Sequence, residues 1–167
     1  MLKIEKQGSR FLIEPSRLVE EEFFDTFDAK LLVDQMFNLM SKHVRIGLAA
    51  PQVAHNIRMF IMGDKQRPYV CINPSVLEWS EDTAVDDEGC LSFPGIYLPI
   101  RRSASVKVAY YDLSGRLTET NLNGIMARCF QHELDHLNGI LFTTHVSKLK
   151  LNIARSKAKK YMKNKSR

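Results

Sequence analysis

The chain of 167 residues lacks the features that mark membrane-spanning or secreted proteins. No apolar run approaches the roughly 18–20 residues that a membrane span needs. The chain does not open with a basic stretch followed by an apolar one, so no secretory signal is expected. Three cysteines are present, an odd number that does not suit a framework of paired disulfides. We therefore expect reduced thiols in a cytosol-like compartment.

Acidic residues are absent from the end of the chain, because no Asp or Glu follows Asp135. Residues 148–167 hold nine Lys and Arg, whereas residues 1–147 hold 15 Lys and Arg against 19 Asp and Glu. The net charge of +5 therefore comes from this basic tail. Such a run is typical either of a solvated C-terminal helix or of a segment that docks on RNA.

The composition that remains is that of a globular protein. Apolar residues make up 44% of the chain, which is enough for one domain with a hydrophobic core. The sequence has no internal repeat and no linker long enough to separate a second domain. We predict a single domain over residues 1–147, with residues 148–167 as a basic helical extension of the same domain.

The hydrophobic pattern predicts an α+β fold. Asp28 is expected to cap a helix whose apolar stripe consists of Leu32, Met36, Leu39 and Met40. Strand-like runs follow at residues 59–62, 69–72, 106–111 and 117–122, with a hairpin turn at 112–115. Asn123 and Asn138-Gly139 then bound a further helix. We expect antiparallel or mixed sheets around this central helix, with other helices at the N- and C-terminal ends.

The most informative stretch is a His-Glu-x-x-His pattern, Gln131-His132-Glu133-Leu134-Asp135-His136. Histidines four residues apart share a helix face, roughly 5–6 Å apart at Cβ, and can bind one metal ion. The glutamate then lies beside the open coordination position, where it can take a proton from metal-bound water as the water attacks a carbonyl carbon. The pattern predicts a metallohydrolase acting on an amide. The alternative is a surface helix that carries these residues by chance.

A catalytic site of this kind needs a third protein ligand. No acidic residue follows the motif, so a downstream Glu ligand is excluded and His145 is the remaining candidate on that side. Among upstream residues, Cys129 lies seven positions from His136, or about 10.5 Å along a helix axis, which is too far to share one ion. We expect Cys129 to line a pocket beside the metal instead.

The other upstream candidates differ in their surroundings. Cys71 lies in an apolar run where a free cysteine usually acts as a small hydrophobe, and His43 and His55 are more typical of solvated or capping residues. Cys90 has the best context because Gly89 and later Gly and Pro residues let backbone approach an ion closely. Judged from the residues alone, the third ligand is either Cys90 or one of the others, with His145 foremost.

Three segments together resemble the peptide deformylase family, and they occur in the family's order. They are Gly47-Leu48-Ala49-Ala50-Pro51-Gln52, Glu88-Gly89-Cys90-Leu91-Ser92 and Gln131-His132-Glu133-Leu134-Asp135-His136. The likeness runs from about Pro15 to Phe142. It implies an enzyme that removes the N-formyl group from the N-terminal formylmethionine of nascent polypeptides and releases formate, with residues 1–147 as the catalytic domain.

The resemblance also implies the metal site. Carried over residue by residue, the ligands would be Cys90, His132 and His136. A soft thiolate with two imidazoles suits Fe(II), Zn, Co or Ni. The family typically works with ferrous iron, so we expect one Fe(II) ion, for which Zn, Ni or Co can substitute.

The same resemblance implies the catalytic groups. Glu133 would be the general acid/base, Gln52 and the backbone N–H of Leu91 would hold the oxyanion, and Gly47 would hydrogen-bond the substrate. These roles agree with the chemistry of amide hydrolysis, because a hydrogen-bond donor aimed at the developing negative charge stabilises the transition state by about 2.7–4 kcal/mol.

Substrate selection is expected at an apolar pocket for the methionine side chain. Ile125 and Cys129 share a helix face with His132 and, together with Ile46, could line this pocket, although Ile125 alone is equally consistent with core packing. Apolar pockets discriminate by only about 1–3 kcal/mol per methylene. We expect a preference for unbranched, Met-like side chains and tolerance beyond that position, as backbone pairing with a strand edge would give.

Two positions depart from the family's pattern. The family usually has Gly-x-Gly before Leu-Ala-Ala, but this chain has Arg45-Ile46-Gly47. If position 45 needs a positive φ, arginine strains the loop; otherwise it adds a cation near the pocket mouth. Asp86 stands where a hydrophobic residue often borders the methionine pocket. Both departures bear on substrate preference rather than on the chemistry.

The resemblance also suggests where the protein works. C-terminal helices of some bacterial deformylases dock on the ribosome near the peptide exit, which favours RNA docking of residues 148–167. We expect no membrane or DNA partner, and a location in a bacterial cytoplasm or in an organellar matrix or stroma. Two alternatives remain. One is a metallopeptidase acting on unformylated peptides, and the other is a ribosome- or RNA-binding relative with impaired catalysis.

Overall fold

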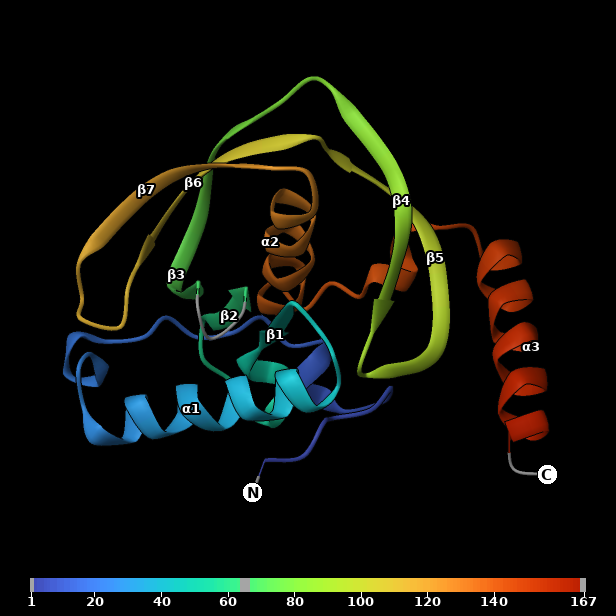
Figure 1. The fold of residues 1–167 in the computed structure, drawn as a ribbon, viewed down its shortest axis with the longest axis horizontal. Coiled ribbons are helices and arrows are strands. Elements are labelled where there is room, and N and C mark those ends of the chain that lie inside the picture. The colour runs from blue at the N-terminus through green and yellow to red at the C-terminus, as the bar shows by residue number, and fades with distance from the viewer. Residues whose placement is uncertain (1, 64–66, 166–167) are drawn as a thin grey trace.

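The computed structural model describes residues 2–63 and 67–165, and within them two antiparallel sheets surround a central helix (Figure 1). The larger sheet has the strand order β1-β2-β3-β6-β7, with bounds Gly47–Ala49, Met59–Gly63, Pro68–Trp79, Ser105–Tyr111 and Leu117–Asn123. The smaller sheet is a hairpin of β4 (Thr83–Cys90) and β5 (Phe93–Ser103). The longer helices are α1 (Phe27–Lys42), α2 (Gly124–Leu137) and α3 (Lys148–Lys165). The predicted α+β fold is therefore confirmed.

Four short 3-10 helices complete the described secondary structure. They are η1 (Arg10–Leu12), η2 (Glu21–Phe23), η3 (Ala50–Val53) and η4 (Phe142–His145). Of these, η3 matters most for the site, because it follows β1 directly and carries Gln52. None of the helices in the described part of the chain is both long and apolar enough to cross a membrane.

Helix α2 occupies the centre of the molecule (Figure 1) and is buried along most of its length. Ala127 and Phe130 pack into the core formed with strands β1, β2, β6 and β7. The Gln131 side chain fixes the helix against β5, because its Oε1 accepts a hydrogen bond from Ser103 N at 3.1 Å and its Nε2 donates to Ser103 O at 2.9 Å. Polar residues on the same helix are buried too, which costs stability unless they have partners or a function.

The strands expected from hydrophobic alternation are present, but several bounds differ. The run at 69–72 is the first part of the longer strand β3, and the turn at 112–115 joins β6 to β7 as predicted. Neither β4 nor β5 was predicted. Residues 83–87 of β4 are all exposed, so they carry no apolar alternation by which a strand is recognised.

The predicted cap of the first helix was wrong. Thr26, not Asp28, is the N-cap residue of α1, and its Oγ1 accepts a hydrogen bond from Ala29 N at 3.1 Å. Asp28 lies in the first turn, where its negative charge still favours the helix dipole. Asn123 does occupy the N-cap position of α2, but its side chain makes no capping hydrogen bond.

Helix α3 stands at the outer edge of the molecule and packs against β5 (Figure 1). Its Ala158 is buried in a hydrophobic cluster that also contains Cys90, Phe93, Leu98 and Phe142. One side of α3 therefore covers part of the hydrophobic cluster that includes Cys90.

Candidate active site

The three predicted metal ligands come together in the structure. Cys90 lies at the end of β4, and His132 and His136 lie one turn apart on α2 with ring centroids separated by 5.1 Å. One ligand atom from each residue falls within 4.8 Å of the other two, and all three side chains are buried. His145 is not part of this group; its Nε2 lies 2.7 Å from Asp135 Oδ2. The structure thus favours Cys90 over His145 as the third ligand.

The chemistry of the three side chains fits a divalent transition metal. Burial alone would raise the pKa of Cys90, but the positive charge of His136 and the hydrogen bonds from both histidines hold that pKa well below its ordinary value. These contacts favour the thiolate of Cys90, which is the form that binds metal. His136 Nε2 faces Cys90 Sγ at 3.3 Å, so sulfur and imidazole nitrogen already converge. Sulfur with two nitrogens is a donor set typical of Zn or Fe(II) sites.

Glu88, to which the sequence analysis gave no role, fixes one of the ligands. Its Oε2 lies 2.9 Å from His132 Nδ1, and since a carboxylate only accepts, Nδ1 donates. The other nitrogen of His132 is thereby left to face Cys90. Glu88 precedes Cys90 by two residues on β4, and residues i and i+2 of a strand point to the same face. The two-residue spacing from Cys90 is therefore the sequence signal that could have identified Glu88 as part of the site.

Two arginines hold the Glu88 carboxylate in place. Arg102 binds both oxygens through Nε and NH2, at 2.9 and 3.0 Å, and Arg128 NH1 lies 2.9 Å from Oε1. Burial opposes the charge of Glu88, but hydrogen bonds from His132 and Arg102 outweigh it and hold its pKa well below the usual range. Arg102 also reaches Asp135 Oδ2 at 2.7 Å. The carboxylate is thus ionised and fully paired.

Glu133 lies beside the ligands on the same helix and has a different environment. It is 4% exposed, and its Oε2 is buried without a hydrogen-bond partner among the described residues. Burial raises the pKa of Glu133 to about 7, although the nearby His132 and His136 act in the opposite direction. A carboxylate with a pKa close to neutrality can both take up and release a proton.

Gln52 presents its amide NH2 group to the site. Its Oε1 accepts a hydrogen bond from Ala49 N at 2.9 Å, which fixes the orientation of the amide. Its Nε2 then points toward Cys90 Sγ at 3.2 Å and Ser92 Oγ at 3.4 Å. Leu91 follows Cys90 in the turn between β4 and β5. Gln52 and Leu91 thus flank the thiolate from η3 and from this turn.

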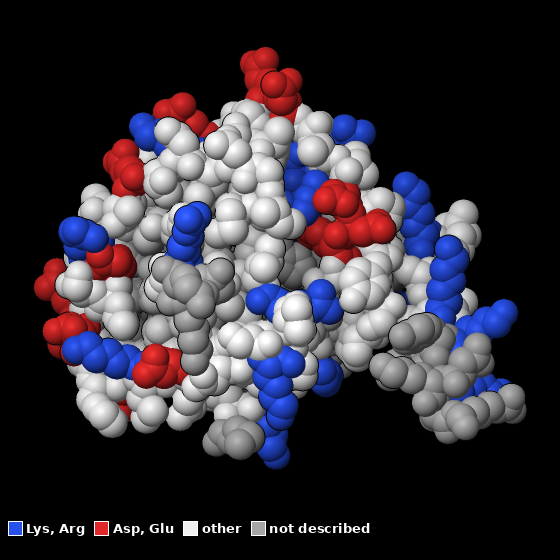
Figure 2. Space-filling view, viewed as in Figure 1, with Lys and Arg blue, Asp and Glu red and all other residues white. Residues whose placement is uncertain are grey.

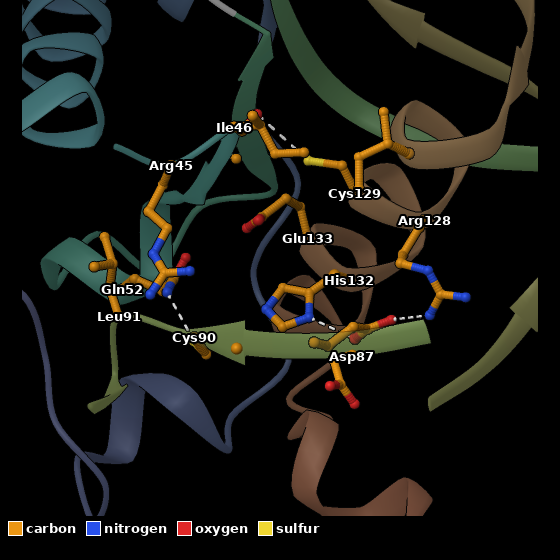
Figure 3. A pocket seen from close by; sticks show the side chains of 14 residues that line it. Arg45, Ile46, Gln52, Asp87, Cys90, Leu91, Arg128, Cys129, His132 and Glu133 are labelled. Atoms are coloured by element: carbon orange, nitrogen blue, oxygen red, sulfur yellow. Dashed lines mark hydrogen bonds and ion pairs between the residues drawn. The ribbon is translucent and has the colours of Figure 1, made fainter. Parts of the chain in front are cut away.

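A cavity of about 160 Å³ opens above these groups (Figure 3). All of the predicted site residues line it except His136, which lies deeper and is 1% exposed. The complete lining consists of Arg45, Ile46, Gly47, Gln52, Asp87, Glu88, Gly89, Cys90, Leu91, Ile125, Arg128, Cys129, His132 and Glu133. The cavity therefore joins the metal group, the glutamate, the amide and the expected apolar pocket in one space.

At Gly47 the backbone lies very close to the side chains of Glu133 and Cys129. A Cβ placed on Gly47 would lie 2.5 Å from Cys129 Sγ and would also collide with Glu133 Oε1. The Cys129 thiol in turn donates to Ile46 O at 3.4 Å. Only glycine lets the β1 backbone lie directly against Glu133.

The two departures from the family's pattern have different outcomes. Arg45 is not among the described non-glycine residues with positive φ, whereas its neighbour Val44 is, with φ 52°. The loop is therefore not strained by arginine, and Arg45 instead adds a cation to the cavity wall. Asp86 is exposed and does not line the cavity, whereas its neighbour Asp87 does.

A buried Cys-His-His group with a glutamate on the same helix defines a class of protein, the metal-dependent hydrolases with a His-Glu-x-x-His helix. The comparisons with known proteins then give the family. A family model described as polypeptide deformylase matches residues 1–152. The chain belongs to this family, and its activity is hydrolysis that removes an N-formyl group.

Individual relatives agree with the family match. A peptide deformylase of Mesorhizobium japonicum is 44% identical over 140 residues, covering 81% of this chain and 80% of the relative. A peptide deformylase structure from Legionella pneumophila matches with a TM-score of 0.89 at 32% identity, over 100% of this chain and 98% of the other. A Met-Ala-Ser-bound peptide deformylase from Acinetobacter baumannii matches with a TM-score of 0.83 at 34% identity, over 87% and 98% of the two chains.

Proposed function

We propose that the chain removes the formyl group from the N-terminal formylmethionine of nascent polypeptides, with Glu133 as general acid/base. The observation that carries this proposal is the position of Glu133. Its carboxylate lies buried beside the Cys-His-His group and against the Gly47 backbone, with one oxygen lacking a partner among the described residues. A buried, unpaired carboxylate is costly, and in an active site this cost is balanced by function.

Cys90, His132 and His136 would hold one divalent cation. When bound, such a cation supplies Lewis acidity and lowers the pKa of a water molecule in its open position. We propose Fe(II) as the physiological ion, with Zn, Ni or Co able to substitute, because a thiolate and two imidazoles suit each of them. Glu88 supports this role because it fixes the ring orientation of His132.

Glu133 would act first as general base and then as general acid. Lying against the reaction centre, it takes a proton from the attacking water and passes it to the nitrogen of the departing amine. A carboxylate with a pKa raised to about 7 suits both steps, since it is neither too weak a base nor too weak an acid at neutral pH.

Gln52 and the backbone N–H of Leu91 would stabilise the oxyanion. Negative charge develops on the formyl oxygen as the carbonyl carbon becomes tetrahedral. The amide of Gln52 is held by Ala49 with its NH2 group toward Cys90, so no reorganisation is needed when that charge appears. A preoriented hydrogen-bond donor of this kind stabilises the transition state by about 2.7–4 kcal/mol.

The methionine side chain would enter the apolar part of the cavity, between Ile46, Ile125 and Cys129. Ile46 and Ile125 are 43% and 59% exposed, which is high for isoleucine and leaves apolar surface that a substrate can cover. The backbone of the substrate would pair with β1. This strand ends the order of the five-stranded sheet, and one edge of it has no strand partner among the described residues. Gly47 on that edge would hydrogen-bond the peptide.

The identity of the substrate is supported by the Acinetobacter baumannii relative, which binds Met-Ala-Ser. That tripeptide is what remains when formyl-Met-Ala-Ser loses its formyl group. We therefore expect this chain to accept formylated peptides with methionine first.

The basic tail would bring the enzyme to the ribosome. Helix α3 places its lysines on the outer edge of the molecule, where Figure 2 shows blue side chains along the rim. Lys148, Lys150, Lys157, Lys159 and Lys160 are all exposed. A group of exposed lysines attracts the phosphates of RNA near the peptide exit. This partner agrees with a location in the bacterial cytoplasm, where nascent chains begin with formylmethionine.

The experiment that tests this function compares two substrates of the same sequence. The protein loaded with Fe(II) under anaerobic conditions is incubated with formyl-Met-Ala-Ser and with unformylated Met-Ala-Ser. The account predicts formate from the first peptide and no cleavage of the second. Cleavage of the unformylated peptide would favour a metallopeptidase, and absence of turnover with RNA binding intact would favour a ribosome-binding relative.

A further inference from the structure

Arg45 forms a bridge from the wall of the active-site cavity to Tyr97. Its NH2 group donates to Tyr97 Oη at 3.2 Å, and its guanidinium carbon lies 5.9 Å from the centre of the Tyr97 ring. Tyr97 is on β5, opposite Gly89 of β4. A Cβ on Gly89 would lie only 2.6 Å from the Tyr97 ring, so the ring covers the backbone next to Cys90. The bridge thus joins the segment before β1 to the hairpin that carries Cys90.

The positive charge of Arg45 has no ion-pair partner among the residues that the structure describes. Of the two arginines that line the cavity, Arg128 is paired with Glu88 at 2.9 Å. Arg45 makes no ion pair with any residue in the described ranges, and its Nε is buried without a hydrogen-bond acceptor there. A guanidinium offers five N–H donors, so Arg45 retains donors for a partner that enters the cavity. Figure 3 shows its side chain extending toward Gln52 and Cys90.

The opposite wall carries a negative charge, but that charge is more exposed to water. Asp87 lines the same cavity and is exposed, whereas Arg45 is partly buried. Water and salt screen the exposed carboxylate more strongly than the partly buried guanidinium. The electrostatic preference of the rim is therefore set by Arg45 rather than by Asp87.

The direction of the substrate follows from the site. The formyl group must lie near Gln52 and Cys90, and Gln52 follows the C-terminal end of β1. A peptide on the free edge of β1 therefore runs antiparallel to that strand, with its formyl end toward Gln52. If the methionine pairs near Gly47, the next residue lies near Ile46 and the one after it near Arg45.

We infer that Arg45 is a specificity-determining residue that binds a carboxylate side chain on the third residue of the formylated peptide. This inference rests on the proposed function, because it needs a formylated peptide in the cavity. Arg45 forms a charge-assisted, bidentate pair with the incoming Asp or Glu, while Tyr97 holds the guanidinium at the cavity wall. Substrates with an acidic third residue are selected over their neutral isosteres.

The test uses two peptides that differ by one charge, formyl-Met-Ala-Glu amide and formyl-Met-Ala-Gln amide. The terminal amide removes the other carboxylate. For the Fe(II)-loaded wild type, kcat/KM should favour the Glu peptide by about tenfold at low ionic strength, and the preference should shrink as salt is added. In Arg45→Met the ratio should fall to about one or below. Arg45→Lys, which keeps the charge but not the planar fork, should give an intermediate ratio.

Two further variants separate binding by Arg45 from a general effect of charge. Tyr97→Phe keeps the ring but removes the hydroxyl that holds Arg45, so it should reduce the ratio without abolishing it. Asp87→Asn changes the charge of the opposite wall by one unit, as Arg45→Met does with the opposite sign, but at an exposed site, and should change the ratio by less than about twofold. Equal ratios in the wild type and Arg45→Met would overturn the inference.

Failure of this inference is distinguishable from failure of the proposed function. If the wild type releases formate from both peptides without preference, only the role of Arg45 is wrong. If the wild type releases no formate, the proposed function fails. The role of Arg45 is then tested by calorimetry, which compares the binding of Met-Ala-Glu amide with that of Met-Ala-Gln amide. Tighter binding of the Glu peptide that is lost in Arg45→Met supports the inference, and equal or absent binding overturns it.

Discussion

His132 Nδ1 lies 2.9 Å from Glu88 Oε2, and this contact connects a metal-ligand helix to a metal-ligand strand. Glu88 is two residues from Cys90 on β4, so one short stretch supplies both a ligand and the group that orients another ligand. Arg102 and Arg128 keep the carboxylate ionised in a buried place. The metal site is therefore assembled by a pair of elements rather than by the His-Glu-x-x-His helix alone.

Glu88→Gln should weaken metal binding. An amide in place of the carboxylate orients His132 less firmly and removes the negative charge that Arg128 pairs with, whereas Arg102 keeps its ion pair with Asp135. Loss of such a partner typically lowers metal affinity by about 10–100-fold. Competition with a chelator measures this affinity, and Glu78→Gln, whose side chain is 73% exposed, is the matched control. Equal affinity in the two variants would show that Glu88 does not position the ligand.

The pH dependence of stability should reveal the buried carboxylate of Glu133. Burial raises its pKa to about 7 from an ordinary value of 4.5. Between these pH values the unfolded chain has released a proton that the folded chain retains, so the free energy of unfolding of the metal-free protein should fall as pH rises. At 1.36 kcal/mol per pKa unit, the fall is on the order of 3 kcal/mol.

Denaturant titrations at several pH values measure this slope, with Glu133→Gln as the control. The variant cannot ionise, so it should lack the part of the slope due to Glu133 and become the more stable protein above about pH 7. Parallel stability profiles for the wild type and the variant would mean that Glu133 has an ordinary pKa.

Gly47→Ala should impair turnover without removing the metal. The added Cβ would collide with Glu133 and Cys129, neither of which is a proposed ligand. Displacement of a catalytic group by about 1 Å can cost about 100-fold in rate. Metal content and kcat/KM are measured together in the variant and in the wild type, which serves as the control. A Gly47→Ala enzyme as active as the control would contradict the close approach of β1 to Glu133.

Neutralising lysines on α3 should weaken ribosome binding and reduce its salt dependence. Deletion of the whole helix is a poor test, because Ala158 is part of the core beside Cys90. Lys159→Gln/Lys160→Gln keeps the helix and removes two exposed charges. Each lost phosphate contact should lower the slope of log affinity against log salt by about one.

Two exposed lysines elsewhere, changed in Lys3→Gln/Lys42→Gln, provide the matched control for overall charge. The prediction is checked by co-sedimentation with ribosomes at several salt concentrations. Equal affinities and slopes for the two double variants would remove α3 as the docking surface.

Local spacing explains why much of the site could be predicted from the sequence. His132, Glu133 and His136 lie within five residues on one helix, so their relative positions follow from helical geometry. Cys90 is different, because its approach to α2 depends on how the β4–β5 hairpin packs. The residues alone therefore made Cys90 the candidate with the best context but left the third ligand open, and the resemblance to a family was needed to decide for Cys90.

The parts that were missed depend on contacts distant in the sequence. Glu88 is held by Arg102 and Arg128, which are 14 and 40 residues away, and no local pattern pairs them. Strand β4 has exposed residues on both faces at 83–87, so alternation could not mark it. Thr26 and Asp28 both belong to residue types that cap helices well, so the sequence alone does not decide between them. In the structure, Thr26 Oγ1 accepts the hydrogen bond from Ala29 N.

The most direct test of the account is formate release from formyl-Met-Ala-Ser by the Fe(II)-loaded wild type beside Glu133→Ala, with metal content measured in both proteins. The account predicts turnover by the wild type and a loss of at least about 100-fold in the variant at equal metal content. A metal-loaded Glu133→Ala protein that releases formate at the wild-type rate would contradict the role of Glu133. A folded, metal-loaded wild type that releases no formate would contradict the proposed function itself.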